Sequence, residues 1–349
     1  MRALNSGGCR GNQGITPPCQ TYSAALGVGC ARGHLAYLKG RYFWHKRTEQ
    51  DLYRSIEEFQ RALGIDPDYA LAHTGLADAY ILIGIWGLED SHSAFRTARR
   101  AAERAIALDD TLAEAHTSMG EVLKDYEWDW GGAETAYRRA IALNPNYSTA
   151  HHFYAQLLAT LARYSEAVDE IELARRVDPL SPGINAYVPY IYVAARDYER
   201  AVVEGRRAVE LEPGSPLARW QLGRACLFSG NVRRAVAELE TASQLANART
   251  MWQAELSFAR ARAGDRSGAE AIVNDMITLM QHEYVSPYDL AVCYAGIGQA
   301  GAALDHLERA YDARVMRIMA IGDPEFDDLR QEPRFLSLMR QLHLPGADL

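Results

Sequence analysis

The 349-residue sequence predicts an all-α fold, a solenoid of about eight helix-turn-helix pairs that ends in a C-terminal capping helix. The first observation is a repeat: Pro145, Pro179 and Pro213 lie 34 residues apart, and alanines stand five and twelve residues before each of them. The second is a helical period, since apolar residues recur at i, i+3, i+4 and i+7 within the units. A unit of this size cannot bury its apolar face alone, so neighbouring units must stack. We expect no strands.

The repeat has a physical explanation in each pair. The two alanines let the second helix approach its neighbours closely, and the proline ends that helix because it cannot donate the next backbone hydrogen bond. The same register extends towards both ends of the chain, from a first unit near Ala36 to a last unit near Ala310. It is interrupted by a longer insertion at residues 85–91 and by a one-residue insertion within residues 127–131.

The two ends of the chain depart from the repeat. Residues 1–33 are rich in Gly, Ser, Asn, Gln and Pro without a helical period, so we expect a flexible, disordered leader before a solenoid at 34–314. A solenoid needs an atypical unit to cover its last apolar face. We therefore expect residues 315–349 to form a cap, which would bury the side chains of Phe326, Leu329, Phe335 and Leu338.

Composition excludes several classes of function. The 37 Lys and Arg against 45 Asp and Glu give a net charge of −8, which would repel a nucleic-acid backbone. The longest apolar run, residues 80–86, is far shorter than the roughly 18 residues of a membrane span. No secretory signal is visible, so we expect a cytoplasmic protein that contacts neither nucleic acid nor membrane directly. The five cysteines form no Cys-x-x-Cys pair and are expected to be free thiols rather than zinc ligands.

The 34-residue period, the paired alanines and the terminal prolines resemble the tetratricopeptide repeat. This resemblance implies a right-handed superhelix with a concave groove. Further strings resemble the C-terminal repeat regions of bacterial winged-helix transcriptional activators, serine/threonine kinases and TolB-like regulators, in which the array senses signals or binds proteins for an N-terminal effector. Our sequence departs from that group because no effector motif precedes Tyr37. The strings lie at residues 37–44, 70–80, 125–130, 144–152, 285–290 and 323–345.

The resemblance also implies which side chains face a partner, because positions 2, 5, 9, 12 and 13 of each first helix line the groove in such arrays. An acidic middle followed by aromatic and aliphatic residues suits a peptide or helix with basic and apolar side chains. Alternatively, Trp220, Leu227 and Phe228 pack against the second helices or an inward curl of the array. The candidate partner-binding residues are Tyr37, Arg41, Trp44, Asp78, Glu114, Thr117, Glu121, Asp125, His152, Gln156, Tyr190, Trp220, Arg224 and Phe228.

Two other groups of residues suggest chemistry, but each has a simpler structural explanation. His73, His116 and His151 occupy equivalent positions roughly 10 Å apart, too far for one metal ion, so we expect each to pack with its own hydrogen bond. The acids and tryptophans of residues 125–130 are expected to be solvated or helix-capping acids and tryptophans tucked between units. No catalytic motif stands in a suitable context, so we expect no enzyme, metal or cofactor.

The sequence thus predicts a non-enzymatic interaction or scaffold module that binds a protein or peptide in its groove. One alternative is a sensory or regulatory subunit of a bacterial transcription or kinase system whose effector is encoded separately. A more distant one is a hydrolase or transferase with its active site in the groove.

Overall fold

The computed structural model describes residues 24–46, 48–246 and 250–346, and in these ranges it contains α-helices, one π-helix and two 3-10 helices but no strand. The first sixteen α-helices form eight pairs, as the repeat predicts. The pairs are α1 (Ala24–Lys46) with α2 (Glu49–Ile65), α3 (Ala70–Ile85) with α4 (Ser91–Leu108), α5 (Ala113–Val122) with α6 (Trp130–Leu143), α7 (Ser148–Thr160) with α8 (Tyr164–Val177), α9 (Pro182–Ala194) with α10 (Tyr198–Leu211), α11 (Pro216–Phe228) with α12 (Val232–Leu245), α13 (Thr250–Arg262) with α14 (Arg266–Leu279), and α15 (Pro287–Gly296) with α16 (Ala300–Asp312).

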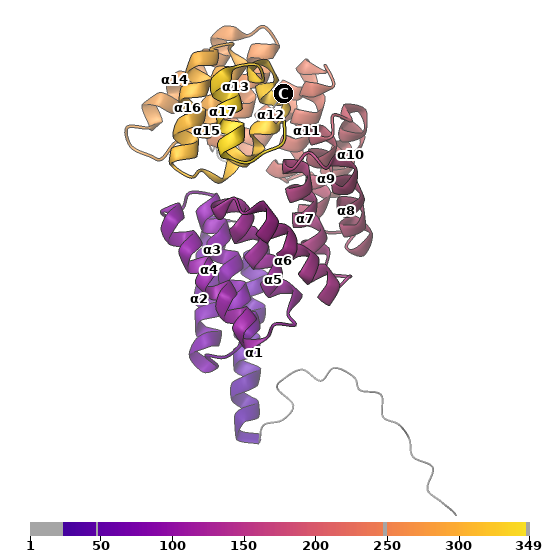
Figure 1. Cartoon of the computed structure of the whole chain (residues 1–349), viewed down its shortest axis with the longest axis vertical. Coiled ribbons are helices and arrows are strands. Elements are labelled where there is room, and N and C mark those ends of the chain that lie inside the picture. The colour runs from indigo at the N-terminus through magenta and orange to yellow at the C-terminus, as the bar shows by residue number, and fades with distance from the viewer. Residues whose placement is uncertain (1–23, 47, 247–249, 347–349) are drawn as a thin grey trace, which may run out of the picture.

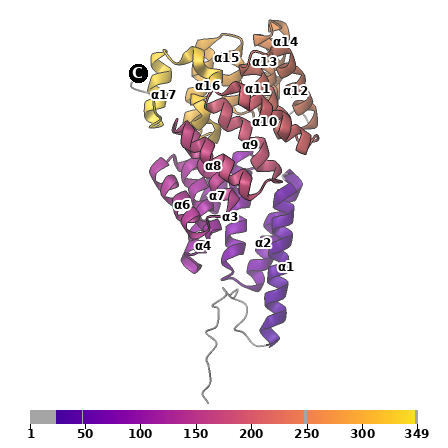
Figure 2. The same ribbon diagram turned by 90° about the vertical axis from the view of Figure 1, so that its right-hand side faces the viewer.

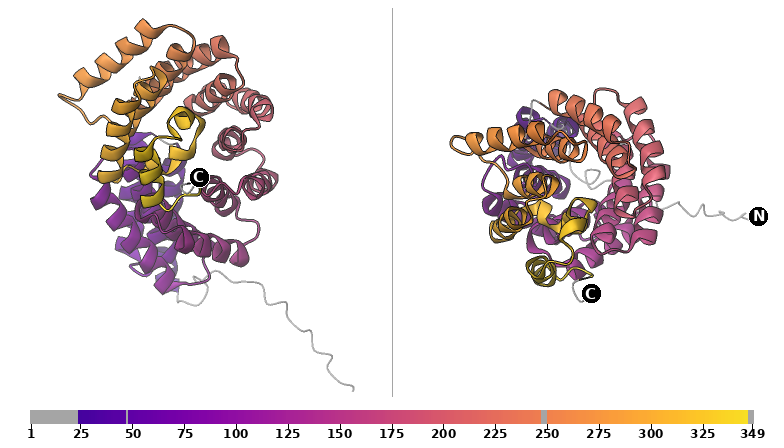
Figure 3. Two further views of the ribbon diagram at one scale, coloured as in Figure 1. Left: turned by 45° about the horizontal axis from the view of Figure 1, so that its top comes forward. Right: turned by 90° about the horizontal axis from the view of Figure 1, so that it is seen from above.

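The pairs pack in chain order into one superhelix, which confirms the predicted fold class (Figures 1 and 2). Each first helix contacts its own second helix and the first helix of the next pair. We call the side that these first helices line the inner face. Seen from above, the pairs curve around a centre (Figure 3).

From the third pair to the eighth, the turn inside each pair repeats its backbone conformation every 34 residues. A residue of left-handed conformation ends the first helix, and the next residue usually caps the second helix, as Asp265 does by accepting the Gly268 N–H at 2.9 Å. The left-handed residues at this step are Trp128, Ala162, Arg196, Gly230, Gly264 and Gly298.

Both insertions lie in the turns between the helices of a pair. The one-residue insertion widens the end of α5 into a π-helix, η2 (Leu123–Glu127), because an extra residue must be accommodated within one turn. The longer insertion leaves a turn between Ile85 and Ser91, in which Gly87 has φ of +63°.

The first helix begins earlier than expected. It starts at Ala24 rather than at His34, so residues 24–33, expected to be disordered, are helical. Once residues 34–46 are held by packing, each further residue adds a hydrogen bond without a new nucleus, and alanine favours this extension. The rest of the expected leader, residues 1–23, lies outside the described residues.

The C-terminal segment, residues 316–341, contains two 3-10 helices and one α-helix: η3 (Met316–Gly322), η4 (Pro324–Leu329) and α17 (Pro333–Gln341). Phe326, Leu329, Phe335 and Leu338 are all buried, as expected for a cap. However, the segment does more than cover the last pair, because it also crosses the inner face and reaches η2 and α7 (Figure 3).

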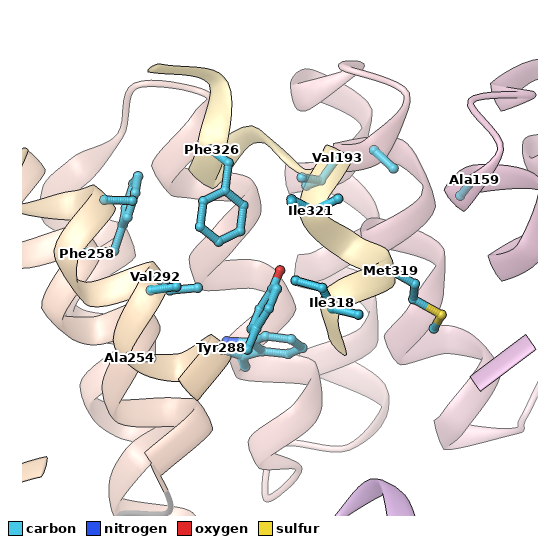
Figure 4. Packing of buried hydrophobic residues seen from close by; sticks show 14 of the residues in the cluster. Ala159, Val193, Ala254, Phe258, Tyr288, Val292, Ile318, Met319, Ile321 and Phe326 are labelled. Carbon is cyan, nitrogen blue, oxygen red and sulfur yellow. The ribbon is translucent and has the colours of Figure 1, made fainter. Parts of the chain in front are cut away.

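Part of the contact between this segment and the helix pairs is an apolar core. Figure 4 shows Ile318, Ile321 and Phe326 of the segment among side chains of α13 and α15. The Phe326 ring meets the Tyr288 ring edge-on, with 5.6 Å between the centroids. A single apolar cluster extends from Trp130 to Leu344, whereas the first two pairs have smaller, separate clusters.

Candidate partner-binding face

The fourteen predicted residues lie on the first helices and on η2, but they differ in exposure. Half of them keep part of their surface: Tyr37, Arg41, Asp78, Glu114, Gln156, Tyr190 and Phe228. The other half are buried and unavailable to a partner in this conformation: Trp44, Thr117, Glu121, Asp125, His152, Trp220 and Arg224.

Hydrogen bonds join the inner faces of the first three pairs through Asp78 of α3. Its carboxylate accepts from Arg41 Nη1 of α1 at 2.6 Å and from Ser118 Oγ of α5 at 2.5 Å. Burial is the largest single effect on Arg41 and opposes its charge, but Asp78, Tyr147 and Tyr37 together outweigh burial and raise the pKa of the guanidinium. The guanidinium also stacks on the Trp44 ring, 4.4 Å from its centroid, which explains why Trp44 is buried rather than presented.

Glu114 lies near two tyrosines at this part of the inner face. Burial raises the pKa of both Tyr37 and Tyr147, and the nearby Glu114 carboxylate raises it further in each. Among the described residues Glu114 has no ion pair, whereas Asp78 has Arg41. The sequence did not predict Ser118 or Tyr147, since neither stands at a position that lines the groove in known arrays.

Two predicted acids of the third pair, Glu121 and Asp125, point into the protein instead of contributing to an acidic surface. Lys124 Nζ lies 2.8 Å from Glu121 Oε1 and 3.2 Å from Asp125 Oδ1, and all three side chains are buried. Glu121 also accepts a hydrogen bond from Tyr137. Burial raises the pKa of Asp125 to about 7, although Lys124 opposes the shift. Because a π-turn holds more residues than an α-turn, α-helical spacing misplaces the side chains of Lys124 and Asp125, which lie in η2.

Thr117 and His152 are also bonded internally. The Thr117 hydroxyl donates to the Ala113 carbonyl at 2.9 Å, within its own helix. Gln156 Nε2 donates to His152 Nε2 at 2.9 Å, and the His152 ring lies 4.9 Å from those of Phe153 and Tyr187. This stretch of the inner face is therefore aromatic and only partly accessible.

The C-terminal segment fills the rest of the inner face, so the prediction that Trp220 and Arg224 contact a partner is wrong for this conformation. Arg224 donates from Nε to Glu325 at 2.7 Å and from Nη2 to Asp323 at 2.8 Å, fully buried. The sequence allows two alternatives for Trp220: packing against the second helices or against an inward curl of the array. The structure is nearer to the second, but the part that turns inward is the C-terminal segment and not the array itself (Figure 3). The Trp220 ring meets Trp252 edge-on.

Two ion pairs at the surface join the segment to the helix pairs: Arg196 pairs with Asp327, and Arg262 pairs with Asp328. Two predicted residues at this end, Tyr190 and Phe228, keep some exposure. Phe228 packs near Phe258 of α13, with 6.2 Å between the ring centroids. Tyr190 lines a cavity of about 170 Å³ against the segment.

Acids outnumber bases in a charged cluster between the segment and the inner face. The buried Arg224 and the partly buried Arg317 face the buried acids Glu255, Asp289, Asp323 and Glu325. Burial raises the pKa of Glu255 to about 8 and that of Asp323 to about 6, and the arginines counter it only in part. A proton on Glu255 relieves the excess of negative charge.

The histidines have structural partners, as predicted. Nε2 of His73, His116 and His151 lies 2.9 Å from the backbone carbonyl six residues earlier, and because a carbonyl can only accept, Nε2 carries the proton. Asn185 and Arg219 make the same contact in the next two pairs. Within the described ranges, no group of three or more His, Cys, Asp or Glu side chains could hold a metal ion.

The acids and tryptophans of residues 125–130 have structural roles, and some of these roles agree with the prediction. Asp129 caps α6 by accepting the Gly132 N–H at 2.9 Å, and Trp130 is buried, with its Nε1 donating to the Leu342 carbonyl at 2.8 Å. Asp125 differs from the expectation, since it is buried beside Lys124 rather than solvated.

Comparisons with known proteins agree with this architecture. A tetratricopeptide-repeat family model matches residues 192–256. Small glutamine-rich tetratricopeptide repeat-containing protein 2 of Mycosarcoma maydis is 27% identical over 112 residues, which are 32% of our chain and 32% of that protein. The match thus spans about a third of this relative's length.

Solved structures share the fold. Yeast Tom70 superposes with a TM-score of 0.53 at 14% identity, covering 93% of our chain and 69% of Tom70. The Cut9–Hcn1 hetero-tetramer of the APC/C superposes with a TM-score of 0.56 at 14% identity, covering 83% of our chain and 52% of that chain. The type IV pilus biogenesis factor PilW superposes with a TM-score of 0.51 at 16% identity, covering 63% of our chain and 96% of PilW.

The superhelix and the 34-residue period are those of a tetratricopeptide-repeat array, and the family model of this repeat matches within it, at residues 192–256. Proteins of this class are modules for protein–protein interaction. None of the helices in the described part of the chain is long and apolar enough to span a membrane.

Proposed function

We propose that the protein is a non-enzymatic interaction module that binds a peptide or helix of a partner on the inner face of its first pairs. The observation that carries this proposal is the division of the inner face: the chain's own C-terminal segment fills one part, while Tyr37, Arg41, Asp78 and Glu114 keep exposed surface in the other.

The chemistry of these four residues favours a basic partner side chain flanked by apolar ones. Arg41 already neutralises Asp78, so Glu114 is the carboxylate left to attract a cation. The neighbouring Tyr37 and Tyr147 offer ring faces, which attract a lysine or arginine and cover apolar surface.

The experiment is a selection of random peptides on the purified protein, followed by affinity measurements by isothermal titration calorimetry. We expect enriched peptides to carry Lys or Arg beside apolar residues, and Glu114→Gln and Tyr37→Ala each to weaken binding about tenfold, the loss of roughly one charge-assisted contact. Glu210→Gln removes an exposed carboxylate from α10 and serves as the control. Equal affinity for the wild type and both inner-face variants would refute the site.

A second candidate is a regulatory subunit of a bacterial transcription or kinase system. It is supported by the sequence strings that resemble the repeat regions of such regulators. Co-elution of the purified protein with a winged-helix or kinase protein of the same cell would test it, and repeated failure to form any such complex would dismiss it.

A further inference from the structure

An apolar stripe runs along the free side of α1. Leu35, Leu38 and Tyr42 are 53%, 49% and 60% exposed, and their spacing of three and four residues places them on one side of the helix. The opposite side of α1 packs against α2 and α3, through residues such as Ala36 and Gly40. The stripe is thus the outer surface of the first pair, where a preceding helix would pack in a longer array.

A basic row borders this stripe. Arg32, Lys39 and Lys46 are exposed and recur every seven residues, so they follow the stripe along one edge. None of the three pairs with an acid of the described chain, and α1 contains no Asp or Glu at all. This is unusual in a protein with a net charge of −8.

Because α1 lies at the outer side of the first pair, the apolar stripe is exposed to solvent, and its burial by another helix would be favourable. An uncovered outer side of a solenoid needs polar residues for solubility, whereas among the described residues this side of α1 carries large apolar groups. The N-terminal end of α1 also projects beyond the neighbouring helices (Figures 1 and 2). A projecting helical end gains little from tertiary packing, which normally supplies most of a helix's stability.

We propose that the free side of α1 docks an amphipathic helix of a partner protein, with an apolar face and acidic flanks. Its apolar face covers Leu35, Leu38 and Tyr42, and its acidic flank pairs with Arg32, Lys39 and Lys46. We choose a helix with acidic flanks because its negative charges complement the positive charges of the basic row. A second copy of the chain is disfavoured, because in an antiparallel pair of α1 helices the two-fold axis would place both basic rows on the same side.

The test uses the full chain and a labelled model peptide of about 18 residues, helical, with leucines on one face and glutamates beside them. A second peptide replaces each glutamate by lysine. By fluorescence anisotropy we expect the glutamate peptide to bind at least about tenfold more tightly than the lysine peptide, and to weaken as salt is raised. The double variant L35S/L38S should lose about tenfold in affinity, and K39E/K46E should reverse the preference between the peptides.

Two kinds of control separate this surface from others. L180S and V203S alter side chains that are 73% and 62% exposed elsewhere and should leave binding unchanged. Y37A and E114Q should also leave it unchanged, so this inference can fail or hold independently of the inner-face site.

Several results would overturn the proposal. Equal binding of both peptides, or no effect of L35S/L38S, removes the docking surface. Co-sedimentation with anionic phosphatidylserine vesicles, abolished by K39E/K46E, without peptide binding would assign α1 to a membrane instead. A concentration-dependent dimer abolished by L35S/L38S would assign it to a second copy.

Discussion

Residues that share a position in the repeat share a role, and this is the level at which the sequence is most informative. The contact that His73, His116 and His151 make with a backbone carbonyl was predictable because it depends on local spacing. The burial of Glu121 and Asp125 was not, since it depends on the π-turn and on Lys124 between them.

The left-handed turn residues illustrate the cost of a side chain at a fixed backbone position. Gly230, Gly264 and Gly298 adopt this conformation without strain, but Ala162 and Arg196 carry a Cβ that opposes it. Arg196 has a compensating role, because its guanidinium bonds Asp327 and the Gly322 carbonyl. Ala162 is exposed and has no such side-chain contact to offer.

We therefore expect Ala162→Gly to stabilise the protein by about 1 kcal/mol and Gly230→Ala to destabilise it by about as much. A Cβ at Gly230 would meet no atom within 4 Å, so its effect is one of backbone conformation alone. Urea unfolding followed by circular dichroism measures both changes. A loss of stability in Ala162→Gly would show that the methyl group contributes more than the strain removes.

At the scale of elements, the sequence predicts which residues of the C-terminal segment are buried but not where the segment lies. Its buried residues, such as Phe326 and Leu338, were predictable from the amphipathic pattern. The position of the segment across the inner face was not predictable. It depends on ion pairs of Asp323 and Asp327 with arginines 99 and 131 residues away, which local sequence spacing does not indicate.

Buried and exposed ion pairs of this segment should contribute very differently. Arg224→Ala leaves Asp323 and Glu325 buried without their cation, and we expect a loss of about 3–5 kcal/mol in the free energy of unfolding. Arg262→Ala breaks the exposed pair with Asp328 and should cost less than about 1 kcal/mol. Chemical denaturation of both variants makes the comparison, and equal losses would mean that the buried network does not hold the segment.

At the scale of the whole molecule, the last pair and the cap return to the third pair. Trp128 stacks on Tyr311 with 5.3 Å between the rings, and Arg314 donates to the Tyr126 carbonyl at 2.9 Å. The sequence predicts eight pairs but not this closure, because curvature depends on small rotations between neighbouring units that sum over the array.

The charges enclosed in this way should make global stability depend on pH. The pKa of Glu255 rises from its usual 4.5 to about 8 in the folded protein, so the folded state holds a proton that the unfolded state releases. This contribution is fully present below about pH 4.5 and is lost as pH rises through about 8; Asp323, with a pKa of about 6, acts in the same direction.

We expect the melting temperature to fall between about pH 5 and about pH 9, and Glu255→Gln to reduce that fall. The exposed Glu210→Gln provides the matched control and should leave the slope unchanged. Differential scanning calorimetry across this range measures the effect, and an unaltered slope in Glu255→Gln would locate the titrating groups elsewhere.

The contact between Trp130 and Leu342 has a consequence for how the chain acquires its structure. Most repeat proteins form through contacts between neighbours, but this hydrogen bond joins residues 212 positions apart. Contacts of such separation slow folding, because a long loop must close before they can form. During synthesis the inner surfaces of the later pairs stay open until residues 316–344 have left the ribosome. Only then is the core that began with Trp130 complete, and until then these pairs have the most to gain from a chaperone.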